Sequence, residues 1–193
     1  MLLETCAGGK RISGKEIKVN KEMMIVSRTN TQGIIEYANP NFSEITGYAL
    51  SELVGKPHNI VRHPDMPKII FKWMWERIQS GRDMYAVVKN RTKNGDYYWV
   101  TTKFDIRHDP QDQAIIGYVA YRKAAPAFVV ESIEKLYRQL LEIEHTSGVE
   151  ASEVFLKGFL DTKGMTYDEY LASLVGHESA FQSFFHKMAD LFR

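Results

Sequence analysis

The sequence predicts an α+β fold, a five-stranded antiparallel sheet with helices across one face, followed by an all-helical C-terminal extension. Two observations predict it. Short β-like runs occur first as a pair and then as a group of three, which is not the strand–helix alternation of a parallel sheet. Beyond Pro126, strand signals disappear and helical periodicity dominates. We therefore divide the chain into a flexible arm (residues 1–21), a domain of ordinary size (residues 22–124) and a helical interaction region (residues 125–193).

The domain is expected to open with a hairpin. Residues 23–29 and 34–37 read as strands, and the polar turn between them ends at Gly33, as hairpin loops often require. Two short helices follow. The first covers residues 40–47 and ends at a glycine, and the second starts at Ser51, its expected N-cap, and ends at the next glycine.

A longer helix and three more strands complete the domain. Asp65 is the expected N-cap of this helix and Pro67 lies in its first turn. Its apolar positions recur at helical spacing: Met66, Ile70, Trp73, Met74 and Ile78. The strands are residues 84–91, 97–106 and 115–122, and an Asn-Gly pair between the first two is a strong hairpin signal.

The C-terminal region is expected to form several helices. Its first helix carries a heptad stripe, which makes it a candidate dimerisation or signalling helix: Val129, Ile133, Leu136, Leu140 and Ile143. A second helix, residues 150–162, aligns Ala151, Val154, Phe155, Gly158 and Phe159. Thr166 and Glu169 form a capping box for a third helix. The last helix, residues 177–192, carries Phe181, Phe184, Phe185, Met188 and Phe192 on one face.

Composition excludes several classes of function. Lysine plus arginine (25) nearly balance aspartate plus glutamate (24), so the net charge of +1 gives no reason to expect binding to nucleic acid or to an anionic membrane. The single cysteine, Cys6, excludes an intrachain disulfide and agrees with a cytoplasmic location. Because no apolar run is long enough for a membrane helix, we expect no direct membrane insertion, and any membrane role to depend on a partner.

The densest chemistry lies in residues 56–67, which hold two histidines, an arginine, an aspartate and three prolines. The prolines restrict their own φ angles and those of the residues before them, so the polar side chains lie on a stiff loop. A stiff polar loop suits binding better than catalysis. No nucleophile triad, phosphate-binding loop or carboxylate cluster is marked elsewhere, so we expect no enzymatic activity.

The first half of the chain resembles a PAS sensor domain of the aerotaxis-receptor type, whose members bind flavin adenine dinucleotide (FAD). The resemblance covers roughly residues 23–123. Tyr37-Ala-Asn39 and Gly47-Tyr48 are general PAS features, whereas the string from Arg62 to Pro67 (Arg-His-Pro-Asp-Met-Pro) is far more specific.

The resemblance implies a flavin site in a cleft between sheet and helices. It implies that a loop set holds or reads out the flavin: Arg62, His63 and Asp65. It implies that a second set lines the cleft: Asn39, Phe71, Trp75 and Asn90. Aromatic side chains suit the flavin ring, amides suit its polar edge, and Arg62 with His58 or His63 supplies cations for the diphosphate. Trp73 and Trp75 cannot both face the same pocket from one helix, so we expect Trp73 in the core or an interface.

The second half resembles the tails of stand-alone cytosolic PAS proteins from split energy-taxis systems, in which a separate membrane chemoreceptor carries the output. Together the two likenesses imply a cytosolic redox sensor. The redox state of FAD would be relayed through the C-terminal helices to a chemoreceptor or HAMP-type partner, with a homodimer as a further expectation.

Two other functions fit the sequence. One is a cofactor-free PAS module for dimerisation, with its cleft filled by side chains; Met84, where family members often carry tryptophan, favours it. The other is a haem-based gas sensor with His63 as the ligand. A light-driven flavin–cysteine adduct is not expected, because Cys6 lies outside the predicted domain.

Overall fold

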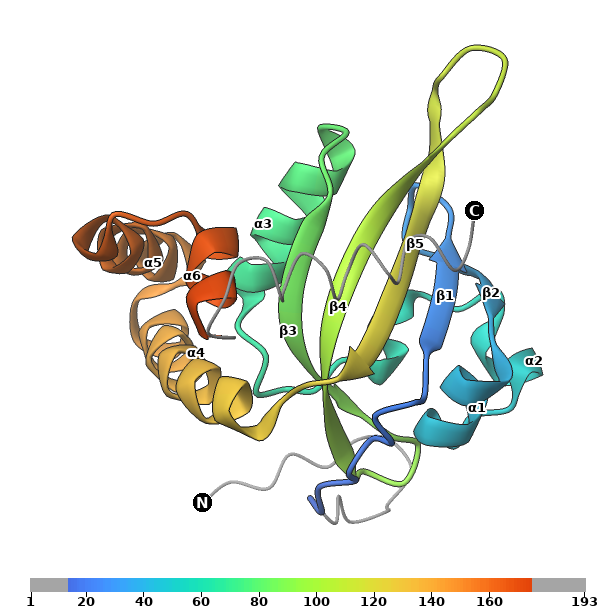
Figure 1. Cartoon of the computed structure of the whole chain (residues 1–193), viewed down its shortest axis with the longest axis horizontal. Coiled ribbons are helices and arrows are strands. Elements are labelled where there is room, and N and C mark those ends of the chain that lie inside the picture. Colours follow the sequence, from blue (N-terminus) through green and yellow to red (C-terminus); the bar gives the residue numbers. More distant parts are fainter. Residues whose placement is uncertain (1–13, 175–193) are drawn as a thin grey trace.

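A computed structural model describes residues 14–174, and its centre is the expected five-stranded antiparallel sheet (Figure 1). The strand order is β2-β1-β5-β4-β3, and neighbouring strands are all antiparallel. The strands are β1 (Ile25–Thr29), β2 (Ile35–Ala38), β3 (Met84–Arg91), β4 (Tyr97–His108) and β5 (Ile115–Ala124). The predicted α+β class is confirmed.

Two groups of helices flank this sheet. The first group follows β2 and covers one face: α1 (Pro40–Thr46), α2 (Leu50–Leu53), the 3-10 helix η1 (His58–Val61) and α3 (Lys68–Gln79). The second group follows β5 and lies beside α3 and β3, away from β1 and β2 (Figure 1): α4 (Ala127–Ser147), α5 (Val149–Lys163) and α6 (Tyr167–Leu174). In the described part of the chain, no helix combines the length and the apolar character needed to cross a bilayer.

The short helices begin and end mostly as their sequences predict. Asn39 caps α1 with its side-chain oxygen, and Gly47 ends α1 in the left-handed region at φ 71°. The second helix differs, because it begins after Ala49 and Ser51 therefore lies inside it. Glu52 reaches back to the Ala49 N–H at 3.0 Å and supplies the cap that was expected of Ser51.

The start of α3 also differs from the prediction. Pro67 precedes the helix and offers no side-chain acceptor, and Asp65 instead pairs with Lys89 at 2.6 Å. The first two backbone N–H groups of α3 donate to the carboxylate of Glu144 in α4, each at 2.9 Å. A residue distant in sequence thus caps the helix, which no local pattern could reveal.

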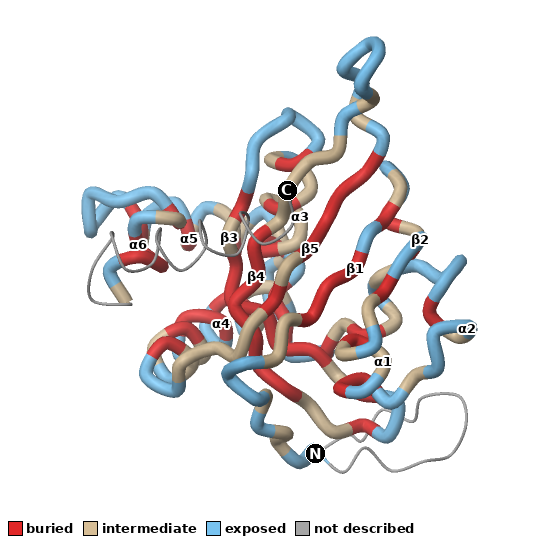
Figure 2. The backbone as a smooth tube through the Cα atoms, turned by 45° about the vertical axis from the view of Figure 1, so that its right-hand side comes forward, coloured by how far each residue is buried: buried red, intermediate tan, exposed pale blue. Residues whose placement is uncertain are grey.

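The strand register assigns side chains to the two faces of the sheet. Tyr98 points to the inner face, beneath α3, and its neighbours Tyr97 and Trp99 point to the outer face, as expected. Buried residues concentrate in the strands and in the helix faces turned toward them (Figure 2).

The heptad stripe of α4 is used within the chain. Val129, Ile133, Leu136 and Leu140 are all at most 3% exposed. Tyr137 lies beside them, stacks on Trp99 with ring centroids 6.4 Å apart, and donates to the Val87 carbonyl of edge strand β3 at 2.7 Å. The prediction of a dimer seam is therefore wrong for these four apolar residues, because they already pack against their own domain. The alternative, a signalling helix, stays a prediction.

The last described helices agree only partly with the predictions. The residues that α5 buries are Ser152, Leu156 and Leu160, whereas Val154 of the predicted face is 72% exposed. The capping box of α6 is confirmed, since Thr166 and Glu169 exchange hydrogen bonds. The predicted helix at residues 177–192 lies outside the described residues.

The described end of the N-terminal arm is tied to the sheet. Ile17 donates to the Tyr97 carbonyl at 2.7 Å, and the Tyr97 N–H donates to the Lys15 carbonyl at 3.0 Å. The expectation of a loose arm up to residue 21 is thus wrong for residues 15–17, because they add main-chain hydrogen bonds to the start of β4.

Candidate cofactor site

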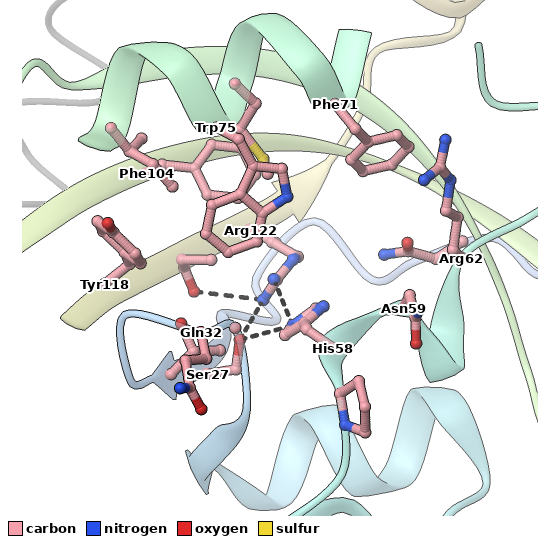
Figure 3. A pocket seen from close by; sticks show the side chains of 17 residues that line it. Ser27, Gln32, His58, Asn59, Arg62, Phe71, Trp75, Phe104, Tyr118 and Arg122 are labelled. Atoms are coloured by element: carbon pink, nitrogen blue, oxygen red, sulfur yellow. Dashed lines mark hydrogen bonds between the residues drawn. The ribbon is translucent and has the colours of Figure 1, made fainter. Parts of the chain in front are cut away.

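A cavity of about 220 Å³ lies between α3 and the inner face of the sheet, with η1 at one side (Figure 3). Its walls combine aromatic and polar side chains. The aromatic residues are Phe71, Trp75, Phe104 and Tyr118. The polar residues include Ser27, His58, Asn59, Arg62, Asn90 and Arg122.

One wall of the cavity is a face of α3. Phe71, Met74, Trp75 and Ile78 recur at helical spacing and all line it. The Trp75 ring meets Tyr118 of β5 edge-on at 5.7 Å. A Cβ atom on Gly33, which has φ +78°, would come within 2.9 Å of the Trp75 ring. The hairpin turn therefore needs glycine both for its conformation and for the space of this tryptophan.

A buried cation forms part of the cavity floor. Arg122 projects from the inner face of β5 and is only 2% exposed. Its guanidinium donates to Ser27 Oγ at 3.0 Å, to His58 Nε2 at 2.9 Å and to the Ala120 carbonyl at 3.3 Å (Figure 3). None of these partners is a carboxylate. Burial lowers the pKa of Arg122 to about 10, so the side chain stays charged at neutral pH.

The histidine beside this cation is neutral. Burial, together with the charge of Arg122, lowers the pKa of His58 to about 3. Its Nε2 therefore accepts from Arg122, and it lies 3.0 Å from the Ser27 hydroxyl, which donates to it. Because Nε2 accepts, the histidine proton is on Nδ1. Ser27, His58 and Arg122, which we call the trio, thus orient one another by hydrogen bonds.

A second polar group faces the cavity without an acceptor. Asn90 lies on the inner face of β3, is 4% exposed and lines the cavity. By hydrogen-bond geometry its Nδ2 has no acceptor among the described residues, and the neighbouring Tyr98 hydroxyl, which is also buried, has no partner either. A buried amide donor without an acceptor costs free energy, so a ligand with an acceptor atom would be favoured here.

The cavity adjoins an open groove of about 540 Å³, and both are lined by Asn59 and Arg62. The Arg62 guanidinium stacks on the Phe71 ring, 3.9 Å from its centroid. The other walls of this groove include His63, Lys68, Pro64, Arg91, Glu144 and His145. Cations therefore outnumber the one carboxylate, which already accepts two N–H groups of α3.

Five of the eight residues that the family resemblance implied line the cavity: His58, Arg62, Phe71, Trp75 and Asn90. Three do not: Asn39, His63 and Asp65. Trp73 lies on the opposite side of α3, edge-on to Tyr167 at 6.4 Å, as expected for an interface residue.

The three absent residues have other tasks. Every polar atom of the Asn39 side chain is engaged in tying α1 to β1, so the expectation that it lines the cleft is wrong. His63 is 7% exposed, packs edge-on against Tyr97 and accepts from the Asp65 N–H at 3.1 Å. Burial and the charge of Lys89 lower the pKa of His63 to about 4. It shapes the loop and borders the groove, not the cavity.

The sequence reasoning missed Arg122 and Ser27. The alternation of side chains along their strands indicates that both residues point inward. On β5, Arg122 alternates with the small residues Ala120 and Ala124, and burying a cation at such a position costs free energy unless a partner or ligand compensates for it.

Comparison with known proteins agrees with this architecture. A family model described as a PAS fold matches residues 35–119. The chain contains a PAS domain. It is 38% identical over 136 residues to the aerotaxis receptor of Escherichia coli (strain K12), covering 70% of this chain and 26% of the receptor. It is 27% identical over 150 residues to sporulation kinase C of Bacillus subtilis (strain 168), covering 74% of this chain and 34% of the kinase.

The PAS domain also has structural neighbours. A light-oxygen-voltage domain solved in a study of a flavin analogue has a TM-score of 0.51 at 21% identity, covering 58% of this chain and 83% of that chain. This likeness shows the fold alone. The chain spans about a quarter to a third of the length of the two curated relatives, so those proteins contain regions that it does not match.

Proposed function

We propose that the chain is a redox and energy-taxis sensor that binds FAD in the PAS cavity and relays the redox state of FAD through its C-terminal helices to a chemoreceptor-type partner. One observation carries the cofactor proposal. The buried Arg122 cation, which has no carboxylate partner in its hydrogen-bond set, and the Asn90 amide without an acceptor line the same cavity.

The donor set fits a flavin. Aromatic and aliphatic walls suit a planar ring system, and the ring's carbonyl-rich edge requires hydrogen-bond donors. Arg122 and Asn90 supply such donors from two different strands. The resulting site is apolar on its faces and polar at one edge.

The adjoining groove favours FAD over a flavin without the second phosphate. Arg62 and Lys68 border it, and Arg62 lies where the groove meets the cavity. A ring in the cavity would leave its chain to run into this cationic groove, where Arg and Lys bind phosphate well. Glu144 is the opposing charge, but the N-terminus of α3 holds its carboxylate.

The residues of this chain explain how redox state is sensed. Bound flavin accepts and returns electrons, which supplies the chemistry. Arg122 favours additional negative charge beside it, because its own hydrogen-bond partners are neutral. Any new hydrogen bond from Arg122 to the ligand competes with those to Ser27 and His58, so a change of charge would rearrange the trio.

The similarity to an aerotaxis receptor supports a signalling role, and the partner proposal extends it. We propose a chemoreceptor or HAMP-type partner because the similar proteins include an aerotaxis receptor and a sporulation kinase, both of which are signalling proteins. A cytoplasmic location, a homodimer and the absence of catalysis are parts of the same proposal.

The two other functions receive less support. In a haem sensor the ligand His63 would have to face the cavity, yet it borders the groove and its Nδ1 accepts from the backbone. In a cofactor-free module the cleft would be filled, yet a cavity is present. Met84, the residue that favoured this alternative, is buried and does not line the cavity.

An absorbance spectrum of the purified chain, before and after incubation with FAD, tests the proposal. The two-band spectrum of an oxidised flavin that bleaches on chemical reduction and returns in air is expected. A haem Soret band would assign the gas-sensor function. A chain that stays colourless after incubation with FAD, FMN and haem would refute the sensor proposal and favour the cofactor-free module.

A further inference from the structure

The outer side of α3 is held by three carboxylates, each from a different C-terminal helix. Glu144 of α4 caps its first turn, Glu153 of α5 pairs with Lys72, and Asp168 of α6 pairs with Arg77 near its end. We call Glu144, Glu153 and Asp168 the carboxylate clamp. The clamp spans α3 from end to end.

Two of the three clamp carboxylates, Glu144 and Glu153, are held by additional contacts. Glu144 also lies 3.3 Å from the hydroxyl of the fully buried Ser152 of α5, whose single proton is shared with the Val149 carbonyl at 2.8 Å. Glu153 accepts from Trp73 Nε1 at 3.3 Å, and its hydrogen bonds with Lys157 and Lys72 lower its pKa to about 2. Multiple donors thus fix both carboxylates in place.

The opposite side of α3 is the wall of the cavity, formed by Phe71, Met74, Trp75 and Ile78. A helix moves largely as a rigid rod, so a displacement of this wall must move the clamp contacts as well. An empty cavity leaves its lining side chains without packing partners, which favours movement of α3 toward the sheet. The clamp contacts hold α3 from its outer side, so they oppose a movement of α3 toward the sheet.

We propose that the carboxylate clamp couples cavity occupancy to the docking of α4–α6. A ligand in the cavity supports α3 from inside and strengthens docking, and the docked helices hold the cavity open for the ligand. This inference rests on the proposed function for the identity of the ligand, FAD, but the coupling itself concerns only residues of this chain. Linkage requires the two effects to be equal in size.

The first test weakens the clamp. Glu153→Gln and, separately, Asp168→Asn keep the side-chain shape and remove the charge, and neither residue lines the cavity or the groove beside Arg62. Glu131→Gln is the matched control, since Glu131 lies on α4, is 74% exposed and, among the described residues, pairs with Lys135 one turn away. Hydrogen exchange of the α5 and α6 amides is expected to accelerate in both clamp variants and to match wild type in the control.

The same variants are then titrated with FAD. The clamp variants are expected to bind FAD at least about fivefold more weakly, the lower end of usual coupling, and FAD is expected to slow exchange in α5 and α6 of the wild type. Clamp variants with faster exchange but wild-type FAD affinity would overturn the proposal. So would clamp variants whose exchange is unchanged.

A second test needs no cofactor. Ala120 lines the cavity from β5, so Ala120→Val and Ala120→Leu fill part of it from the sheet side. Slower exchange of α5 and α6 in a folded cavity-filled variant is expected, and unchanged exchange in both would overturn the coupling. If the wild type binds no FAD, the proposed function fails, whereas this test still decides whether the clamp senses the cavity.

Discussion

Replacing Arg122 with methionine tests whether this buried cation serves to bind a ligand or to stabilise the fold. Methionine keeps much of the length and apolar volume of the side chain and removes its charge. If the cation serves a ligand, the folded protein without that ligand carries an unnecessary cost of burial. The substitution is therefore expected to abolish FAD binding and yet to leave the ligand-free protein at least as stable as the wild type.

The magnitude follows from the burial of the guanidinium. Burial lowers the pKa of Arg122 from 12.5 to about 10, which corresponds to roughly 3 kcal/mol against the charged form. The variant loses the hydrogen bonds to Ser27, to His58 and to the Ala120 carbonyl, each of which contributes about 1 kcal/mol. Ser27 and His58 still bind each other. The two effects nearly cancel, so the free energy of unfolding is expected to rise by less than about 1 kcal/mol.

Urea unfolding of the ligand-free chain measures this difference. Arg28→Met is the matched control, because Arg28 lies on the outer face of β1 and is exposed. The control is expected to keep both its FAD affinity and its stability within about 0.5 kcal/mol. A drop of more than about 2 kcal/mol for Arg122→Met would show that the cation holds the fold together, and unchanged FAD affinity would remove it from the site.

Two further predictions concern stability. Tyr137→Phe removes the buried hydroxyl that donates to the Val87 carbonyl, so urea unfolding should show a loss of about 1–3 kcal/mol; an unchanged midpoint would mean that water or another donor replaces it. His58 has a pKa of about 3 in the folded protein and 6.5 ordinarily, so the folded state favours its neutral form. The contribution of His58 to the free energy of unfolding is therefore fully present above about pH 6.5. Below that pH it falls by up to about 1.4 kcal/mol per pH unit. Unfolding between about pH 7 and about pH 5 should show this loss in the wild type and less of it in His58→Asn, and equal slopes would contradict the assignment.

The fold was largely predictable because local signals agree with its long-range contacts. The hairpin turn at Gly33 and the end of α1 at Gly47 depend on neighbours in sequence, and they follow the expected patterns. The start of α3 was not predictable in this way. Its cap is Glu144, which lies on a helix that packs against it only in the folded chain.

The candidate site was predictable in part. The family resemblance led to Arg62, Phe71, Trp75 and Asn90, which line the cavity. The alternation of its strand indicates that Arg122 points inward, but its partner Ser27 was not predictable, because only the pairing of β5 with β1 brings the two residues together. Side chains that cooperate across a sheet carry no spacing signal in the sequence.

The role of the α4 stripe shows the same limit. A heptad pattern records an apolar face, and it does not say whether that face meets a second chain or its own domain. Here Ile133 and Leu140 are completely buried within the chain, beside the Tyr137 contact with the edge strand. The tertiary structure was needed to decide.

The most direct test of the central claim is a titration of the full chain with FAD, followed by the change in flavin fluorescence. We expect saturable binding of one FAD per chain and competition by riboflavin for the cavity. Riboflavin is expected to bind more weakly than FAD, because it lacks the phosphates that the groove beside Arg62 would hold. Absence of saturable binding, or saturation that Asn90→Leu and Arg122→Met leave unchanged, would contradict the central claim.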